Sequence, residues 1–317
     1  MNTEPSNRVY LHIGMDKCGT SYLQETLRLN RKSLEHHGIT YLPVGRMGIK
    51  YRSSMLQLHD PKQMEEWHRV AARINQVNGT VLFSYEGLYH LTTDKWRIVR
   101  QLLAPRELHI ILYLRHQSDM MASGLAQRIK NSTSKYDYRF HVEEETGYFS
   151  SLSFQNLLGR FKEFPDSSIH LRLYEKSSFY RNNLVSDFLD ILNLDADIPG
   201  NEGFTRRPSI ANPTLDVEGI HIMSELKRTG AKDHQLKTAR SYLTEHSLLD
   251  GHTFIPQRVL NLVADHVEAD NQAVAQRWFN RTRLFLDPPR YSWRPLDITR
   301  LGKLYDDLEQ FLSQSAE

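Results

Sequence analysis

The sequence predicts an α/β protein in which helices cover both faces of a parallel sheet, in three layers, followed by a helical C-terminal part. Three observations predict this. Short apolar segments alternate with segments whose apolar residues recur at helical spacing, as expected where crossover helices join parallel strands. Residues 108–114 are almost entirely apolar, which suits a central strand covered on both faces. From about residue 210 onward no convincing strand is found.

We expect strands at residues 8–13, 80–84, 108–114 and 169–174, the last alternating as in a half-exposed strand. Apolar stripes indicate helices through Leu23, Leu27 and Leu34; Met64, Trp67, Ala71 and Ile74; Met121, Leu125 and Ile129; Val185, Phe188, Leu189 and Leu192; and Leu301, Leu304, Leu308 and Phe311. Pro256 stands where the first turn of another helix would begin. The polar residues 131–150 predict a long loop.

These elements fit a single domain over residues 1–317. Residues 8–200 would form its α/β core, and residues 210–317 a mainly helical extension packed on that core. No internal repeat or low-complexity tract divides the chain.

Composition restricts the function and the compartment. The 40 basic and 38 acidic residues leave a net charge of +2, so nucleic-acid binding driven by bulk charge is not expected and any anion site must be local. A single cysteine excludes an internal disulfide bond, and the first residues lack the apolar core of a signal peptide. The longest apolar stretch is too short to span a bilayer. We therefore expect a cytoplasmic protein without a transmembrane segment.

The most informative segment is L-H-I-G-M-D-K-C-G-T-S-Y-L-Q, residues 11–24. A buried strand leads into Gly14, and a helix opens at Thr20 and Ser21 directly after Gly19. Such a loop aims backbone N–H groups and a helix N-terminus at one point and can hold a phosphate group. The hydroxyl groups of Thr20 and Ser21 can add donors. Alternatively, the glycines only make the turn.

This loop differs from the loop of nucleotide triphosphatases. Those proteins need lysine directly before the Ser/Thr, whereas this chain has Thr20 there and carries its lysine at Lys17. The strand at residues 108–114 ends in Arg115, not in an aspartate that could bind magnesium. A P-loop small-molecule kinase or nucleotide hydrolase is therefore an alternative for which the chain lacks two residues, the lysine directly before the Ser/Thr and the aspartate that binds magnesium.

The pattern strand–G-x-x-K-x-G-T-[ST]-x-L-Q resembles the phosphosulfate-binding loop of sulfotransferases that use 3′-phosphoadenosine-5′-phosphosulfate, especially bacterial and carbohydrate-directed members with their P-loop-like fold. The resemblance implies that Lys17 stabilises negative charge on the departing phosphate oxygen. It also implies that the amides of Gly19, Thr20 and Ser21 hold the 5′-phosphate, in a loop that begins at Gly14.

The donor carries a second phosphate, on its 3′ position, and the resemblance implies a site for it. Arg115 ends the predicted central strand, where open α/β sheets bind ligands, and Ser123 follows on the next helix. Sulfotransferases use such a pair for the 3′-phosphate, and a guanidinium can donate two parallel hydrogen bonds to phosphate. Alternatively, Arg115 caps the sheet rim and Ser123 faces solvent. Arg206 and Arg207 stand where a nucleotide-closing loop would lie, within a resemblance that covers about residues 8–215.

Transfer to an acceptor also needs a base that takes the acceptor proton. Glu86 follows the apolar strand at residues 80–84, at the place where carbohydrate-directed sulfotransferases have a glutamate proposed as base. His90 and His116 are the alternatives, because an unperturbed histidine has the more convenient pKa. Glu86 could instead be a rim carboxylate or an ion-pair partner of Lys17.

Cys18 could be a nucleophile, since a helix N-terminus can lower the pKa of a thiol. No Cys–His arrangement is discernible around it, so we interpret Cys18 as a small residue of the binding loop, where the sulfotransferase family usually has threonine or another small residue. The 15 histidines are scattered and predict no metal site.

The sequence therefore predicts a sulfotransferase that acts on a hydroxyl or amine of a glycan, a glycolipid or a small metabolite, with no nucleic-acid partner and no metal. Besides the kinase or hydrolase, a second alternative is a non-catalytic nucleotide-binding protein that has kept the fold and lost the base.

Overall fold

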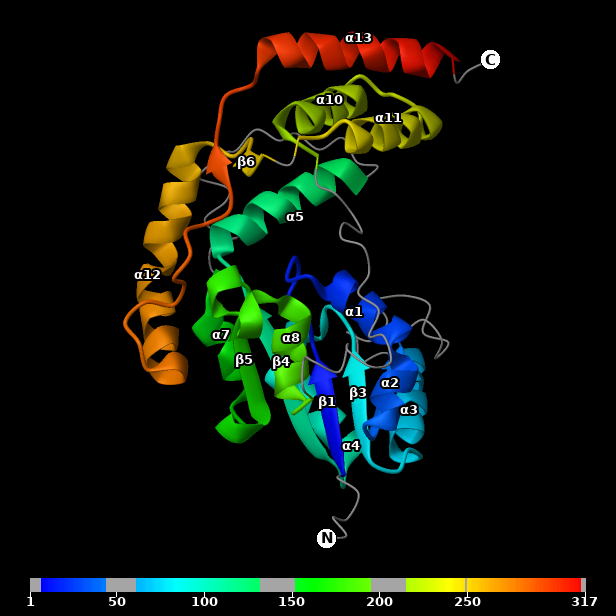
Figure 1. Ribbon diagram of the computed structural model, residues 1–317, viewed down its shortest axis with the longest axis vertical. Coiled ribbons are helices and arrows are strands. Elements are labelled where there is room, and N and C mark those ends of the chain that lie inside the picture. Colours follow the sequence, from blue (N-terminus) through cyan, green and yellow to red (C-terminus); the bar gives the residue numbers. More distant parts are fainter. Residues whose placement is uncertain (1–6, 44–60, 132–151, 195–214, 249, 315–317) are drawn as a thin grey trace. The chain divides into compact units, whose positions relative to one another are not determined.

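The computed structural model describes residues 7–43, 61–131, 152–194, 215–248 and 250–314. They form an α/β fold around a five-stranded parallel sheet with the strand order β2-β3-β1-β4-β5 (Figure 1). The strands are β1 (Arg8–His12), β2 (Ile39–Pro43), β3 (Thr80–Ser84), β4 (Glu107–Leu114) and β5 (Ile169–Leu173). The predicted fold class is confirmed.

The helices that matter below are α1 (Thr20–Leu29), α2 (Arg31–His36), α3 (Pro61–Asn75), α4 (Thr93–Leu103), α5 (Gln117–Asn131), α7 (Phe154–Leu158), α8 (Leu184–Ile191), α10 (Val217–Arg228), α11 (Asp233–Glu245), α12 (Gln257–Phe279) and α13 (Ile298–Gln314). The apolar stripes in the sequence predicted α1, α3, α5, α8 and α13, and α12 begins one residue after Pro256. Of the predicted loop at residues 131–150, Asn131 ends α5 and the rest lies outside the described residues.

Strand β1 lies at the centre of the sheet, between β3 and β4 (Figure 1). Its last residue, His12, is in register with Ser84 of β3 and Ile111 of β4. From β1 the chain passes to β2, returns to β3 beside β1, and then crosses to β4 on the other side of β1. The direction of winding therefore changes at the carboxyl end of β1, which is where open α/β sheets bind their ligands.

The two sides of these strands differ in polarity. Val9 and Leu11 of β1 are fully buried apolar residues, whereas His12 is a fully buried imidazole. Its Nδ1 lies 2.8 Å from Ser84 Oγ, and its ring packs edge-on against Phe188 of α8 at 5.2 Å. Burial lowers the pKa of His12 to about 4, so the ring is neutral inside the fold.

Two further imidazoles, on β4 and β5, contact each other. Nδ1 of His109 and Nε2 of His170 are 3.0 Å apart; the His109 ring stacks on Tyr10, and the His170 ring is tilted against Tyr10. Burial, and then the neighbouring charges of His109 and Arg172, lower the pKa of His170 to about 4. The surroundings of His12 and of the His109–His170 pair therefore favour neutral imidazoles.

We expect acid to destabilise the fold through these histidines. Because the pKa of His12 is about 4 in the folded chain and 6.5 without burial, the unfolded state binds more protons between these values. The contribution of neutral His12 to the free energy of unfolding is complete above pH 6.5. It is lost as the pH falls towards 4, and the loss amounts to about 3 kcal/mol. Urea unfolding of the wild type and of His12→Asn at pH 7 and pH 4.5 measures this loss, which is smaller in the variant. Equal losses in the two proteins would contradict the assignment.

Three local expectations are corrected by the structure. Strand β2 was not predicted, because a short edge strand that ends in Pro43 carries little strand signal. The stripe through Leu34 is divided into α1 and α2 at Asn30, whose Nδ2 donates to the Thr26 carbonyl oxygen at 2.6 Å and competes with the helix backbone. After residue 210 there is a short parallel pair, β6 (His252–Thr253) and β7 (Ser292–Trp293), too short to show a periodicity.

The chain divides into two compact units. The first contains β1–β5 with α1–α4, α7 and α8, and the second contains α5, α10, α11, α13 and the β6–β7 pair. The two units alternate along the chain; one boundary falls between Arg115 and His116, and another inside α12, after Ala269. That the whole chain acts as one domain stays a prediction.

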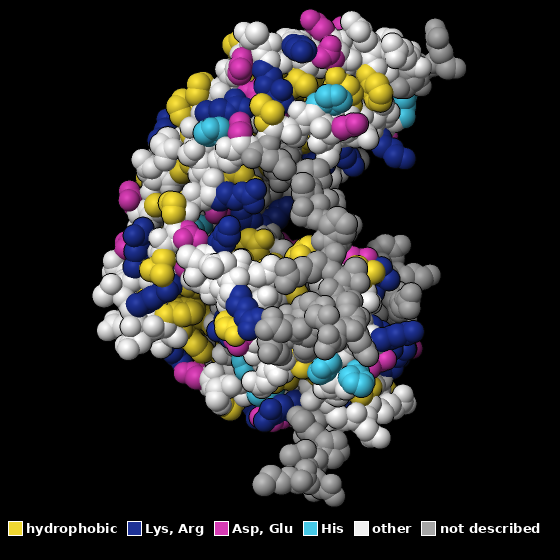
Figure 2. All heavy atoms as spheres, in the orientation of Figure 1, with side chains coloured by type: hydrophobic (Ala, Val, Ile, Leu, Met, Phe, Trp, Pro, Cys, Tyr) yellow, Lys and Arg dark blue, Asp and Glu magenta, His cyan; other side chains and the backbone are white. Residues whose placement is uncertain are grey.

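The second unit is held together by apolar packing of its helices. One core cluster combines buried residues of α5, α10, α11 and α13, namely Ala126, Ile129, Ile220, Ile222, Met223, Leu236, Ala239, Leu243, Leu304 and Leu308. On the outside of α10, α11 and α13, Lys and Arg side chains lie among Asp and Glu side chains (Figure 2). Burial of the apolar stripes, rather than surface charge, therefore drives this packing.

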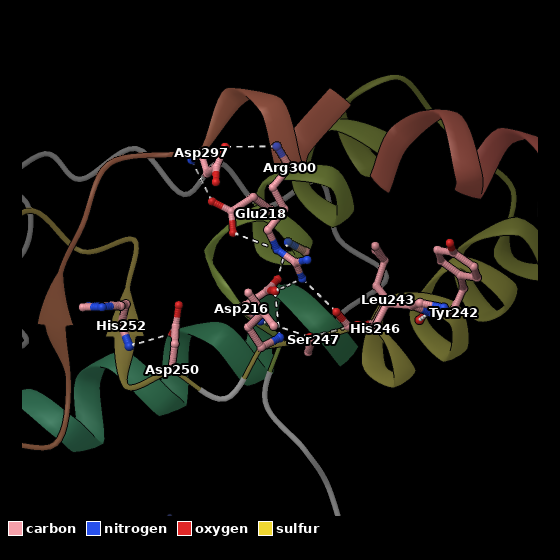
Figure 3. Close-up of polar contacts among 12 residues, drawn as sticks. Asp216, Glu218, Tyr242, Leu243, His246, Ser247, Asp250, His252, Asp297 and Arg300 are labelled. Carbon is pink, nitrogen blue, oxygen red and sulfur yellow. Dashed lines mark hydrogen bonds and ion pairs between the residues drawn. The ribbon is translucent and has the colours of Figure 1, made fainter. Parts of the chain in front are cut away.

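Two buried carboxylates fix the first turn of α10. Asp216 accepts a hydrogen bond from the Gly219 N–H at 2.9 Å and pairs with Arg300 of α13 at 2.5 Å (Figure 3). Glu218 is fully buried and receives both terminal nitrogens of Arg294, at 2.6 and 2.7 Å. Burial opposes the charged form of Glu218, but the hydrogen bonds, that from Arg294 foremost, outweigh it and lower the pKa of this carboxyl group.

Breaking the buried pair should cost far more than breaking an exposed one on the same helix. Glu218→Gln leaves the Arg294 guanidinium without its main countercharge and should lower the free energy of unfolding by about 3 kcal/mol. Glu225→Gln removes the partner of the exposed Arg228 and should cost at most about 1 kcal/mol. Urea midpoints of the two variants make the comparison, and similar losses in both would refute it.

Candidate functional site

The loop between β1 and α1 contains three residues in the left-handed region. Gly14 has φ 51°, Lys17 φ 68° and Gly19 φ 70°. A Cβ on Gly14 would lie 3.0 Å from Thr20 Cγ2 and 3.3 Å from the Cα of Glu86. A Cβ on Gly19 would lie 2.7 Å from Leu184 Cδ2. Both glycines are therefore needed for conformation and for space.

Lys17 adopts the same conformation without being a glycine, and Arg115 holds it there. Nη1 of Arg115 donates a hydrogen bond to the Lys17 carbonyl oxygen at 2.6 Å. Arg115 is almost fully buried, and its guanidinium carbon lies 5.4 Å from the ring centroid of Tyr174. The end of β4 thus fixes the loop that follows β1.

The first turn of α1 opens directly from this loop. Gly19 is its N-cap, and neither a capping side chain nor an acidic residue occupies the turn. The N–H groups at this end carry the positive end of the helix dipole and suit an anion. The Thr20 hydroxyl donates to the Met15 carbonyl oxygen at 3.4 Å, and Ser21 is exposed.

Cys18 lies beneath the loop. Its side chain is fully buried, and its Sγ donates to the Tyr113 carbonyl oxygen at 3.4 Å. Burial raises the pKa of the Cys18 thiol to about 12; the Arg115 charge opposes this shift, and the charges of Asp16 and Glu86 add to it. A thiol with that pKa is inert at neutral pH, which supports the interpretation of Cys18 as a small packing residue.

Glu86 follows β3 and lies beside the loop. It is half-buried, its Cα approaches Gly14 as described above, and the next N–H, of Gly87, donates to the Gly14 carbonyl oxygen at 3.5 Å. Tyr89 bonds to Asp16 of the loop, and burial followed by the charge of Asp16 raises the pKa of Tyr89. Glu86 is thus a carboxylate next to the loop between β1 and α1.

His90 ends the short 3₁₀ turn Leu88–His90 and also faces the loop's charge. Burial lowers the pKa of His90, the Asp16 carboxylate opposes this, and Arg160 adds to it. A neutral imidazole at neutral pH can accept a proton. Two of the three candidate bases, Glu86 and His90, therefore belong to the first unit and interact with residues of the loop between β1 and α1.

The remaining predicted residues are placed differently. His116 and Ser123 belong to the second unit and Arg115 to the first, so the pairing of Arg115 with Ser123 stays a prediction. Ser123 is buried, and its hydroxyl donates to the Asp119 carbonyl oxygen at 2.6 Å. Arg206 and Arg207 lie outside the described residues.

Tyr174 is a site residue that sequence reasoning did not single out. It directly follows β5, and its N–H donates to the Leu114 carbonyl oxygen at 2.6 Å. Its hydroxyl oxygen lies 3.1 Å from the Cβ position that Gly19 lacks, while its ring lies under Arg115. Its position directly after a strand could have identified Tyr174 in the sequence, because residues that follow parallel strands meet at one edge of the sheet.

In the described ranges, no group of three or more His, Cys, Asp or Glu side chains could hold a metal ion. None of the helices described here is long and apolar enough to cross a membrane.

Comparison with known proteins identifies no family. No protein-family profile matches the chain, and no solved structure matches it. The chain is similar to an uncharacterized protein of Archaeoglobus fulgidus, with 26% identity over 133 residues. The matched part is 42% of this chain and 35% of that protein, so the similarity spans about a third of the relative's length and assigns no activity.

Proposed function

We propose that the protein is a sulfotransferase that moves a sulfuryl group from 3′-phosphoadenosine-5′-phosphosulfate to a hydroxyl or amine of an acceptor, with a glycan, glycolipid or small metabolite as the acceptor class. The observation that carries the proposal is the β1–α1 loop. Three of its residues have left-handed conformations, it opens a helix N-terminus that has no capping side chain, it carries Lys17, and Arg115 contacts it from the carboxyl end of β4.

The residues of this loop fit a phosphosulfate. Gly14 and Gly19 supply the positive φ angles of the loop, and the N–H groups at the start of α1 can donate hydrogen bonds to a phosphate oxygen. Lys17 is half-buried within this loop. The donor supplies the sulfuryl group. Side chains and backbone amides of the chain would bind the donor, stabilise the leaving group and take the acceptor proton.

Transfer then needs positioning and two charge movements. The acceptor oxygen or nitrogen bonds to sulfur as the bond from sulfur to the phosphate oxygen breaks. Lys17 stabilises the negative charge that develops on that leaving oxygen. Glu86, or His90 in its place, takes the proton from the acceptor, so that protons and charge balance. Lys17 and the base act mainly in the transition state.

Magnesium-dependent phosphoryl transfer is the second candidate. Glu86 lies next to Gly14, and a carboxylate at this place could hold a magnesium ion beside a triphosphate. Against it, Thr20 occupies the position where such loops have lysine, and β4 is followed by Arg115. Binding of ATP with magnesium, in preference to adenosine 3′,5′-bisphosphate, would favour this candidate.

Arg115→Ala tests the donor site. If the guanidinium also contacts the 3′-phosphate, the variant loses a charge-assisted bond of about 1.5–3 kcal/mol, and affinity for adenosine 3′,5′-bisphosphate falls about tenfold to a hundredfold. Adenosine 5′-phosphosulfate lacks that phosphate and should lose less affinity. Titration calorimetry with both ligands makes the comparison, with Arg97→Ala on the exposed face of α4 as the matched control. Equal losses for the two ligands would restrict Arg115 to holding the loop.

Glu86→Gln tests the chemistry. The amide keeps the shape of the side chain but cannot accept a proton, so turnover of labelled donor with a panel of acceptors should fall about 10²–10⁴-fold, with bisphosphate affinity nearly unchanged. Lys17→Ala should likewise lower turnover more than binding, because loop amides hold most of the 5′-phosphate. If Glu86→Gln keeps wild-type turnover while folded His90→Gln is inactive, the base is His90. If the wild type turns over the donor with none of the acceptors, the alternative of a non-catalytic nucleotide-binding protein is favoured.

A further inference from the structure

A cavity of about 220 Å³ lies in the second unit. One wall is the start of α10, where Val217 and Ile220 lie three positions apart on one face and are both buried. The other walls come from the end of β6, from β7 and from the segment that joins β7 to α13. Six of the eight lining residues are apolar: Val217, Ile220, Phe254, Trp293, Pro295 and Leu296.

Two contacts bring these segments together. Thr253 of β6 is in register with Trp293 of β7, and Phe254 follows Thr253 directly. Arg294, the next residue after β7, donates from Nη1 and Nη2 to the fully buried Glu218 of α10, at 2.6 and 2.7 Å. The strand pair and this ion pair therefore fix the chain after β7 against the start of α10.

The cavity opens to solvent beside Trp293. This large apolar side chain is 44% exposed, and the lining residue Pro295 is exposed too. Val217 and Ile220, in contrast, line the cavity from the buried face of α10. Exposed apolar surface at the opening of an apolar cavity is typical of a site that binds a ligand.

The charge that lines the cavity is already paired. Each nitrogen of the Arg294 guanidinium donates to an acceptor: Nε to Asp250 at 3.1 Å, and Nη1 and Nη2 to Glu218, with a further bond from Nη1 to the Pro295 carbonyl oxygen at 3.1 Å. Two carboxylates thus face one guanidinium, so Arg294 offers no uncompensated charge to an anion. His221, the remaining lining residue, adds an imidazole ring.

The volume and the walls restrict the ligand. An apolar cavity of about 150 Å³ can hold benzene, so this larger one has room for an aromatic ring with a small substituent. The rings of Phe254 and Trp293 can pack against such a ring edge-on or offset. A sugar ring would instead bring several hydroxyl groups, for which apolar walls provide few hydrogen-bonding partners.

We propose that this cavity binds an uncharged aromatic compound about one ring in size. The apolar walls provide the attraction, and the paired state of Arg294 favours a neutral ligand over an anion. The cavity shares no residue with the β1–α1 loop, and its role does not depend on the proposed transferase activity.

An NMR titration with benzamide and benzoate tests the ligand class. The two compounds have nearly the same size and shape, but only benzoate is charged at neutral pH. Because a charge is unfavourable against apolar walls that lack a free countercharge, benzamide should bind about tenfold more tightly or better. The indole N–H signal of Trp293, identified by its absence in Trp293→Phe, should shift as benzamide binds.

Substitutions in the lining test the location. Trp293→Ala removes the ring at the opening and Leu296→Trp fills the cavity, so each should weaken benzamide binding about tenfold or more. Ile298→Ala is the matched control, because Ile298 is 71% exposed in the same part of the chain and lies outside the lining. Urea midpoints establish that each variant is folded. Since Trp293 is half exposed, Trp293→Ala keeps the test decisive if Leu296→Trp does not fold.

Five results would overturn the proposal. Benzamide fails to bind up to its solubility limit, benzoate binds as tightly as benzamide, or folded Trp293→Ala binds benzamide as wild type does. Displacement of benzamide by a methyl galactoside would assign the cavity to a sugar. A wild-type dimer that Trp293→Ala converts to a monomer, measured by sedimentation, would assign it to a second copy of the chain.

Discussion

The hydrogen bond from Arg115 to the Lys17 carbonyl oxygen is the contact on which the candidate site depends. A left-handed conformation costs a residue with a side chain about 1–2 kcal/mol. A hydrogen bond from a charged donor contributes about 1.5–3 kcal/mol, which is enough to hold Lys17 in this conformation. Without that bond, the loop between Gly14 and Gly19 would lose the contact that offsets the left-handed conformation of Lys17.

This contact depends in turn on the register of β1 and β4. His12 pairs with Ile111, and the Ile13 N–H donates to the Ile111 carbonyl oxygen at 3.1 Å. The register places the Tyr113 carbonyl under Cys18 and Arg115 beside Lys17. A slip of one residue would move every side chain of β4 to the other face, so the buried apolar residues of both strands also determine the geometry of the loop.

The sequence predicted the elements that carry this geometry because their signals are local. The apolar runs of β1, β3 and β4 and the glycines of the loop are visible along the chain, and the structure has strands and left-handed glycines at those places. The missing information was non-local. The position of Tyr174 under Arg115, like the pairing of β2 with β3, depends on contacts between residues far apart in sequence, and no periodicity reports them. The break at Asn30 depends on one side-chain hydrogen bond.

The near-neutral net charge of +2 says little about where anions can bind, because many carboxylates are already engaged. Glu175 accepts the N–H groups of Leu286 and Asp287, Asp119 accepts those of Arg290 and Tyr291, and Glu218 holds Arg294. Each of these carboxylates is buried and fixes a chain segment, so its charge is not available to compensate a cation elsewhere. For a protein of this composition, the pairing of individual buried charges, and not their sum, determines where an anion can bind.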